Sequence, residues 1–442
     1  HRLFLEVCRH RLSVERPGDV RVVHARAARW FAAHGEPVEA VRHALLAEDW
    51  QLVARTAVSH AGALVFGHAG RTTQTLLRGL PDDTAPQDVW FACARTLAWY
   101  DDIGGAELGR RLDAAEALLA ETDPETRRTP ELVLALVRAA RNRASYDVKA
   151  ATLHSTRALS LAEGVSPEEV PAIGRYVALA HALLGKSLVW QGLLPLAESH
   201  LRAARVTDLP APGLPGIDDT AVLATAYLAL VMAMNGSLEA ARVEAESALD
   251  LAARAGWADD AQITAAHLAL TLIHILQADH AAAERSVSDA SRVLATKPDL
   301  LLEICRRVAS VRLLALDGDH EAAAMALGEA DAMVRTLPDV DFLSGWIEIL
   351  YAENDLAAGR YEELLGRVRE SDGLFGPMPT HARVVRARAL LSLGRADEAL
   401  ASVTPVITDD LPARQAVIAW LIVAEAQESL RQAYISGKSA SL

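Results

Sequence analysis

Basic, aromatic and acidic side chains recur at matching positions of a repeated helical pattern, and their types suit ligand binding. The pattern consists of helix pairs, each joined by a short turn. Positions 3, 6, 10 and 13 residues before each turn lie on one face of the first helix of the pair. The polar and aromatic residues at these positions are Arg95, Trp99, Arg143, Lys186, Arg312, Trp346, Glu353 and Arg388, together with Asp102 and His381. Guanidinium and ammonium groups bind carboxylates and phosphates, and indole rings offer a stacking surface. We predict a concave groove that captures an anionic or polyhydroxyl ligand, or an acidic segment of a partner protein. The alternative is that these are the solvated faces of amphipathic helices.

The elements that would position these residues are paired helices joined by short turns. The turns centre on Gly35, Gly105, Tyr146, Gly192, Gly236, Ala278, Gly318, Gly359 and Gly394. Five and twelve residues after most of these turns stands an alanine, as in Ala241 and Ala248, with a small or apolar residue nine after. These offsets place the three residues on one stripe of the second helix. Small residues there, and before several turns (Ala98, Gly185, Ala229, Ala352, Ala387), let the two helices approach closely.

The repeats determine the predicted fold. After Gly105 the turns recur at intervals of about 40 residues, longer than the roughly 34 of a minimal tetratricopeptide unit. Stacked units of this kind form a superhelix with a concave face. We therefore predict an all-α superhelical solenoid of tetratricopeptide-like helix pairs. The Pro- and Gly-rich segment 209–216 is the predicted weak joint between repeats.

Composition and motifs exclude several classes of function. The formal net charge of −14 argues against nucleic-acid binding by most of this chain, and no apolar stretch is long enough for a membrane span. No zinc, redox, nucleophile-elbow or phosphate-loop motif is present; Gly185-Lys186-Ser187 lacks the preceding glycine and strand of a phosphate loop. His267 and His274 share a helical face without a further metal ligand, and Cys8, Cys93 and Cys305 are expected to be core residues. We predict a cytoplasmic protein that is not an enzyme and binds no metal.

Residues 1 to about 81 differ in sequence pattern from the later repeats, and the first 50 of them carry a resemblance to a known family. The segments that carry it are an H-x-L-F helix start at His1, A-A-R-W-F-A-A-H-G ending at Gly35, and E-A-V-R-H-A-L-x-A-x-D-W ending at Trp50. This succession resembles the junction between the ATPase module and the helical-repeat sensor of MalT-type, ATP-dependent regulators of the LuxR family. The later repeats fit that sensor only in a general way.

The resemblance implies a domain plan and a function. Residues 1–80 would be a helical linker after a winged-helix and ATPase module, and residues 81–442 a tetratricopeptide-like superhelical sensor. This fragment would hold no cofactor; ATP would bind the upstream module, and DNA would bind only through a helix-turn-helix beyond its C-terminal end. The sensor would bind a small effector or a protein partner, with possible self-association. Two alternatives stay open: a free-standing tetratricopeptide-like interaction scaffold, and an enzyme built on a helical toroid.

Overall fold

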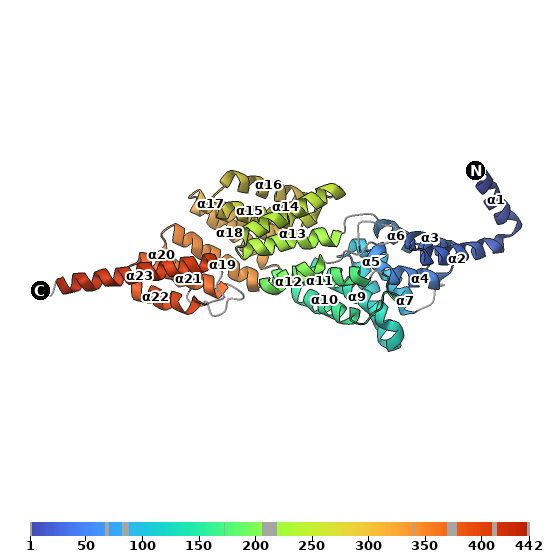
Figure 1. Ribbon diagram of the computed structural model, residues 1–442, viewed down its shortest axis with the longest axis horizontal. Coiled ribbons are helices and arrows are strands. Elements are labelled where there is room, and N and C mark those ends of the chain that lie inside the picture. The colour runs from blue at the N-terminus through green and yellow to red at the C-terminus, as the bar shows by residue number, and fades with distance from the viewer. Residues whose placement is uncertain are drawn as a thin grey trace. The chain divides into compact units, whose positions relative to one another are not determined.

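The described residues of the computed structural model are helical, and they contain no β-strand (Figure 1). They comprise residues 2–66, 70–81, 88–171, 173–205, 219–338, 341–368, 378–408 and 413–439. Contacts divide the chain into two compact units. The N-terminal unit comprises His1–Leu184 and Arg202–Ala221, and the C-terminal unit comprises Gly185–Leu201 and Val222–Leu442. The predicted joint at 209–216 lies outside the described residues.

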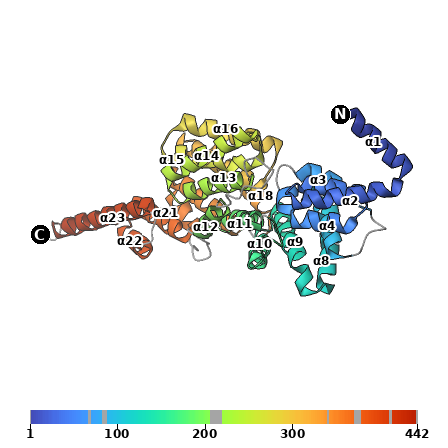
Figure 2. The ribbon, with the colours of Figure 1, turned by 45° about the vertical axis from the view of Figure 1, so that its right-hand side comes forward.

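The N-terminal unit is built from short helices followed by longer pairs (Figure 2). Its elements are α1 (Arg2–Glu15), α2 (Pro17–Ala33), α3 (Pro37–Leu46), α4 (Trp50–Ser59), α5 (Ala61–Leu64), α6 (Gly70–Leu77), α7 (Val89–Leu97), the 3₁₀ helix η1 (Tyr100–Asp102), α8 (Ala106–Glu121), α9 (Pro124–Ala144) and α10 (Val148–Ala162). Helices α11 (Ile173–Val189) and α12 (Leu194–Ala204) each contribute residues to both units.

The C-terminal unit continues with helix pairs of more even length. Its further elements are α13 (Asp219–Met234), α14 (Leu238–Ala255), η2 (Ala261–Ile263), α15 (Thr264–Leu276), α16 (His280–Thr296), α17 (Leu300–Leu316), α18 (His320–Val334), α19 (Asp341–Ala357), α20 (Tyr361–Arg367), α21 (Met378–Ser392), α22 (Ala396–Val403), η4 (Thr404–Val406) and α23 (Ala413–Ser439). Each unit is therefore a stack of helix pairs, which confirms the predicted all-α solenoid fold of tetratricopeptide-like pairs.

The turns of the repeats depend on backbone conformations that favour glycine. Six predicted turn glycines have positive φ, from 73° to 84°: Gly35, Gly192, Gly236, Gly318, Gly359 and Gly394. Two of the predicted turns reach the same region without glycine, at Tyr146 (φ 63°) and Ala278 (φ 58°), and so does Glu48 (φ 56°) between α3 and α4. A left-handed residue ends one helix and reverses the chain toward the next. The prediction is wrong at Gly105, which has φ −69° and is the N-cap of α8.

The small residues of the second helices are buried as predicted in most repeats. On α14, Ala241, Ala245 and Ala248 are all 0% exposed. Helix α8 is the exception, because its predicted stripe of Arg110, Ala114 and Ala117 is not buried. The buried residues there are Leu108, Leu112 and Ala115. The true register is two residues earlier, since η1 rather than Gly105 reverses the chain.

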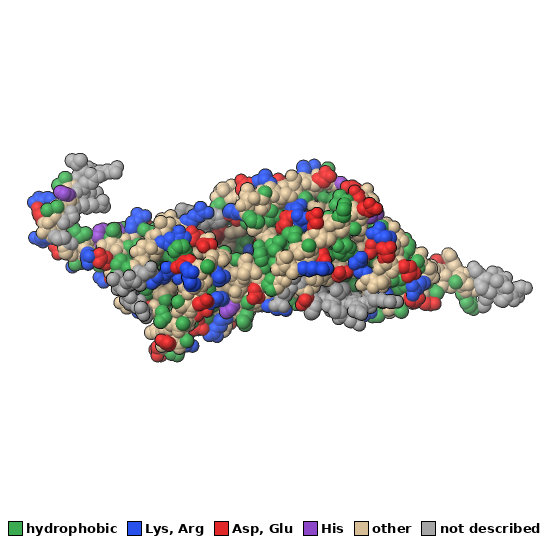
Figure 3. Space-filling view, turned by 180° about the vertical axis from the view of Figure 1, so that it is seen from behind, with side chains coloured by type: hydrophobic (Ala, Val, Ile, Leu, Met, Phe, Trp, Pro, Cys, Tyr) green, Lys and Arg blue, Asp and Glu red, His purple; other side chains and the backbone are tan. Residues whose placement is uncertain are grey.

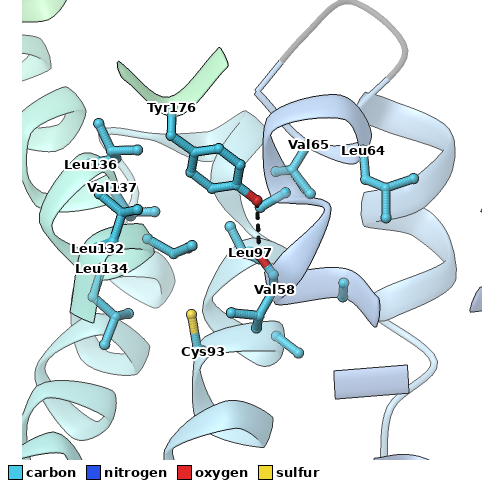
Figure 4. Packing of buried hydrophobic residues seen from close by; sticks show 14 of the residues in the cluster. Val58, Leu64, Val65, Cys93, Leu97, Leu132, Leu134, Leu136, Val137 and Tyr176 are labelled. Carbon is cyan, nitrogen blue, oxygen red and sulfur yellow. Dashed lines mark hydrogen bonds between the residues drawn. The ribbon is translucent and has the colours of Figure 1, made fainter. Parts of the chain in front are cut away.

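The core of the N-terminal unit lies between α4, α5, α7, α9 and α11 (Figure 4). Tyr176 of α11 is fully buried in it, among Leu97, Leu136 and Val65 (Figure 4). Leu77 and Leu80 share this core with helices that follow residue 81. The predicted boundary near residue 80 therefore does not separate two hydrophobic cores. That residues 1–80 and 81–442 are a linker and a sensor stays a prediction.

Candidate functional site on the first helices of the repeats

Three predicted site residues from successive first helices meet on one face of the C-terminal unit. The Glu353 carboxylate on α19 lies between two partners: Arg312 Nη2 on α17 is 3.3 Å from Glu353 Oε2, and His381 Nε2 on α21 is 2.8 Å from Glu353 Oε1. All three side chains are partly exposed, at 23% for Arg312, 31% for Glu353 and 28% for His381. We call this row of three residues the inner polar row.

The repeat register explains why these side chains meet. Arg312 and Glu353 both stand six residues before a turn glycine with positive φ, at Gly318 and Gly359. Equivalent residues of stacked first helices lie side by side, so opposite charges at that position come within ion-pair distance. Helix pairing thus brings together residues that the sequence places 41 apart. The pattern found these positions, whereas their pairing with one another required the structure.

Arg388, the next predicted cation, lies beside a groove in the same unit. Its side chain is exposed, and with Leu391 and Ser392 of α21 it forms one wall of a cavity of about 750 Å³. Leu356 and Tyr361 complete that side of the cavity. The opposite wall comes from α23, and consists of Ala424, Glu425, Glu428 and Ser429. The cavity is therefore partly apolar, with one basic and two acidic side chains.

Two predicted residues of the C-terminal unit have other roles. Lys186 of α11 places its Nζ 4.8 Å from the centre of the Tyr227 ring on α13, a cation–π contact. Trp346 is only 6% exposed and its ring stacks on Phe342 at 6.2 Å between centroids. The expectation that Trp346 offers an open stacking surface is wrong, because an indole of this size contributes more by filling the core.

In the N-terminal unit, Arg95 and Trp99 belong to a cluster of arginines. The guanidinium of Arg78 lies 4.8 Å from the Trp99 ring centroid and that of Arg111 lies 5.9 Å away. Burial, and then repulsion from Arg111, lower the pKa of Arg95. The Trp99 ring therefore contacts the protein's own cations rather than offering a bare surface. The repeat register does not select Arg78 or Arg111, and no sequence signal marks them.

Arg143, the remaining predicted cation, is buried. It is 5% exposed near the C-terminal end of α9. The prediction that Arg143 faces solvent in a groove is therefore wrong. Asp102 is exposed beside this region. The predicted residues thus form two sets, one in each unit. Only the C-terminal set joins side chains from three successive repeats, and it is the better candidate for a binding face.

Other reactive groups give no second site in the described part of the chain. No cluster of three or more His, Cys, Asp or Glu there has the geometry to hold a metal ion. Cys93 and Cys305 are buried, and burial raises the pKa of the Cys305 thiol to about 12; Cys8 is exposed, contrary to expectation. None of the helices in the described ranges is both long and apolar enough to cross a bilayer. On the face seen in Figure 3, acidic and basic side chains intermingle.

Comparisons with known proteins return distant structural similarities. No family model and no curated protein matches the chain. A Rap protein in complex with competence and sporulation factor is 13% identical with a TM-score of 0.49, covering 87% of this chain and 97% of its own. A signal-transduction ATPase with numerous domains and a tetratricopeptide-repeat sensor, from Pyrococcus horikoshii, is 11% identical with a TM-score of 0.40, covering 91% and 71%. Yeast Tom70 is 12% identical with a TM-score of 0.36, covering 94% and 97%.

Proposed function

We propose that this chain is the ligand-binding helical-repeat arm of a bacterial transcription regulator. The ligand is a small anionic or polyhydroxyl effector, or an acidic segment of a partner protein, and it binds at the inner polar row. The observation that carries the proposal is the meeting of Arg312, Glu353 and His381 from three successive repeats. The groove residue Arg388 lies on the same helix as His381.

The chemistry of the row suits such a ligand. A hydroxyl group of the ligand can donate to Glu353, while a carboxylate or phosphate can accept from Arg312 and Arg388. Each ion pair of the row is only partly buried, so its exchange for a ligand contact costs little. The three residues of the row stand on three helices of different repeats. A ligand that binds one packing arrangement of these helices more tightly shifts the equilibrium toward that arrangement.

The regulatory part of the proposal rests on the resemblance of residues 1–50 to ATP-dependent LuxR regulators. There, ligand binding would be transmitted to an ATPase module and a DNA-binding module outside these 442 residues. A free-standing interaction scaffold is the alternative, since it would use the same face for a partner segment. The full-length gene distinguishes them, because only a regulator encodes the two further modules.

A thermal-shift screen tests the binding face. A panel of sugars, sugar phosphates and carboxylic acids is added to the wild-type chain and to Glu353→Ala and Arg312→Ala variants. Arg242→Ala on α14 is the matched control, because Arg242 also forms ion pairs, with Glu239 and Glu246, but away from the row. We expect at least one compound to raise the melting temperature of the wild-type and Arg242→Ala proteins, and not that of Glu353→Ala or Arg312→Ala. An equal shift in Glu353→Ala would contradict the proposed site.

A further inference from the structure

The last helix of the C-terminal unit carries an exposed apolar stripe. Val417, Trp420 and Leu421 of α23 are 59%, 57% and 57% exposed, and Ala424 is exposed one turn later. Residues 417, 421 and 424 have the i, i+4, i+7 spacing of one helix face. The other side of α23 is buried in a core shared with α21 and α22, through Ala419, Ile422 and Val423. An exposed stripe of this kind marks a surface that another element covers.

A comparison with α21 shows what kind of element is missing. The sequence from Ala419 to Glu428 repeats the pattern from Ala382 to Leu391, with alanines at the first, sixth and eighth positions of both. Ala382 and Ala419 are both buried, and so are Ala389 and Ala426. The two helices thus use equivalent residues toward the preceding repeat. Helix α23 is therefore the first helix of a further repeat.

The equivalent positions differ on the side where the second helix packs. On α21, Val384 and Ala387 are 6% and 0% exposed, and they share a core with Ala399 and Val403 of α22. Their counterparts on α23, Leu421 and Ala424, are exposed. Helix α23 continues to Ser439, past the position that corresponds to the turn at Gly394, and within the described residues no second helix packs on this side of it.

The charges beside this stripe indicate the chemistry of the occupant. Glu425 and Glu428 flank Ala424 on α23 and line the groove together with Arg388 of α21. Neither carboxylate forms an ion pair within the described ranges, and Glu428 accepts a hydrogen bond from Gln432 at 3.0 Å. The corresponding residues of α21 are Arg388 and Leu391, so the acidic character is specific to α23. Two copies of α23 packed through this stripe would bring these carboxylates together, which disfavours self-association. A helix with Lys or Arg at its flanks is complementary instead.

We propose that the α23 stripe, formed by Val417, Leu421 and Ala424 with Glu425 and Glu428 beside it, is a docking site for a basic amphipathic helix of a partner protein. That helix takes the place of a second repeat helix. It packs small residues against Ala424 and apolar residues against Leu421 and Trp420, as the second helices of the array do on their own partners. The site borders the groove residue Arg388, but it includes none of the three residues of the inner polar row.

A designed peptide tests the docking site. The probe is a fluorescein-labelled, 18-residue helical peptide with Ala, Leu and Ala at i, i+4 and i+7 and lysines on both sides of this stripe; a second peptide carries glutamates in place of the lysines. Fluorescence anisotropy measures binding to the full chain. We expect saturable binding of the lysine peptide and about tenfold weaker binding of the glutamate peptide. Absence of binding by the lysine peptide would overturn the proposal.

Variants locate the binding on α23. Ala424→Arg blocks close approach at an exposed position and is expected to weaken binding at least about tenfold, whereas Ala117→Arg, at an exposed position of α8, leaves it unchanged. The double variant Glu425→Lys/Glu428→Lys is expected to prefer the glutamate peptide. Equal binding by Ala424→Arg, or no change of preference, would refute the site.

Two further measurements distinguish docking on α23 from self-association and from binding at the inner polar row. Sedimentation of the chain without peptide is expected to show a monomer; a dimer that Ala424→Arg abolishes would assign the stripe to a second copy instead, against the proposal. Arg312→Ala is expected to leave peptide binding unchanged, because Arg312 belongs to the inner polar row. Loss of peptide binding in Arg312→Ala would place the peptide at the row and refute docking on α23.

Discussion

The hydroxyl of Tyr176 donates a hydrogen bond to the backbone carbonyl oxygen of Val58 at 3.0 Å, across 118 residues of sequence. The bond is fully buried and connects α11 to α4 inside the N-terminal unit (Figure 4). The bond holds α11, the first helix of the last pair in that unit, against the short helices at the start of the chain. Tyr176 and the short helices therefore belong to one packed core of the N-terminal unit.

We expect Tyr176→Phe to lower the free energy of unfolding of the N-terminal unit by about 1–2 kcal/mol. The substitution removes the buried hydrogen bond between the Tyr176 hydroxyl and the Val58 carbonyl, which keeps a backbone N–H partner at the end of α4. Urea unfolding followed by fluorescence measures the change. Tyr361→Phe is the control, since the partly exposed Tyr361 hydroxyl has no hydrogen-bond partner within the described residues, and its loss is expected to be neutral.

Gly62→Ala is expected to destabilise the N-terminal unit by about 1–3 kcal/mol through overpacking. A β-carbon at Gly62 would lie 2.9 Å from Tyr176 Cε2 and 3.3 Å from Arg175 Cβ. Gly328→Ala is the matched control: it lies within α18, and its β-carbon would meet only Tyr351 Oη, at 3.6 Å. There we expect a gain of about 0.8–1 kcal/mol from helix propensity. A similar loss in both variants would contradict the packing at Tyr176.

Two repeat turns should respond to opposite substitutions with opposite signs. Ala278 has φ 58°, and Ala278→Gly is expected to raise the free energy of unfolding by about 0.5–1 kcal/mol, because glycine adopts this conformation without steric cost. Gly318 has φ 81° with no atom near its would-be β-carbon, so Gly318→Ala is expected to cost about 1 kcal/mol by backbone strain alone. Thermal unfolding of both variants measures these changes; equal signs would refute the shared turn geometry.

Stability should fall as the pH is lowered below about 6.5. Burial lowers the pKa of His267 below its usual value of 6.5, and burial also lowers the pKa of His60. The unfolded chain then binds more protons than the folded chain, so this contribution is complete above pH 6.5 and lost as the pH falls through 6.5 and below. Urea unfolding at pH 7.5 and 5.5 is expected to show a smaller loss for His267→Gln than for the wild-type protein. An unchanged loss would contradict protonation of His267 as a cause.

The failures of sequence reasoning in this chain have specific physical causes. Gly104 and Gly105 are adjacent, and the repeat spacing predicts the turn at the second, although the 3₁₀ helix η1 reverses the chain and Gly105 caps α8. The difference moves the predicted stripe of α8 by two residues. The repeat register selected Trp346 and Arg143 as groove residues, but both side chains are buried. Their burial depends on how much of that helix face is covered by neighbouring helices, which the register does not specify.

The amino-acid sequence alone determined the helix pairs, most of their turns and the alanine stripes, because these depend on residues within one or two helical turns of each other. It also placed Arg312 and Glu353 at equivalent repeat positions. Tertiary structure alone decided that these two side chains pair, that Tyr176 reaches Val58, and that Ala424 is left uncovered while Ala387 is buried. Such contacts join segments distant in sequence, and only the packing of whole helices brings them into reach.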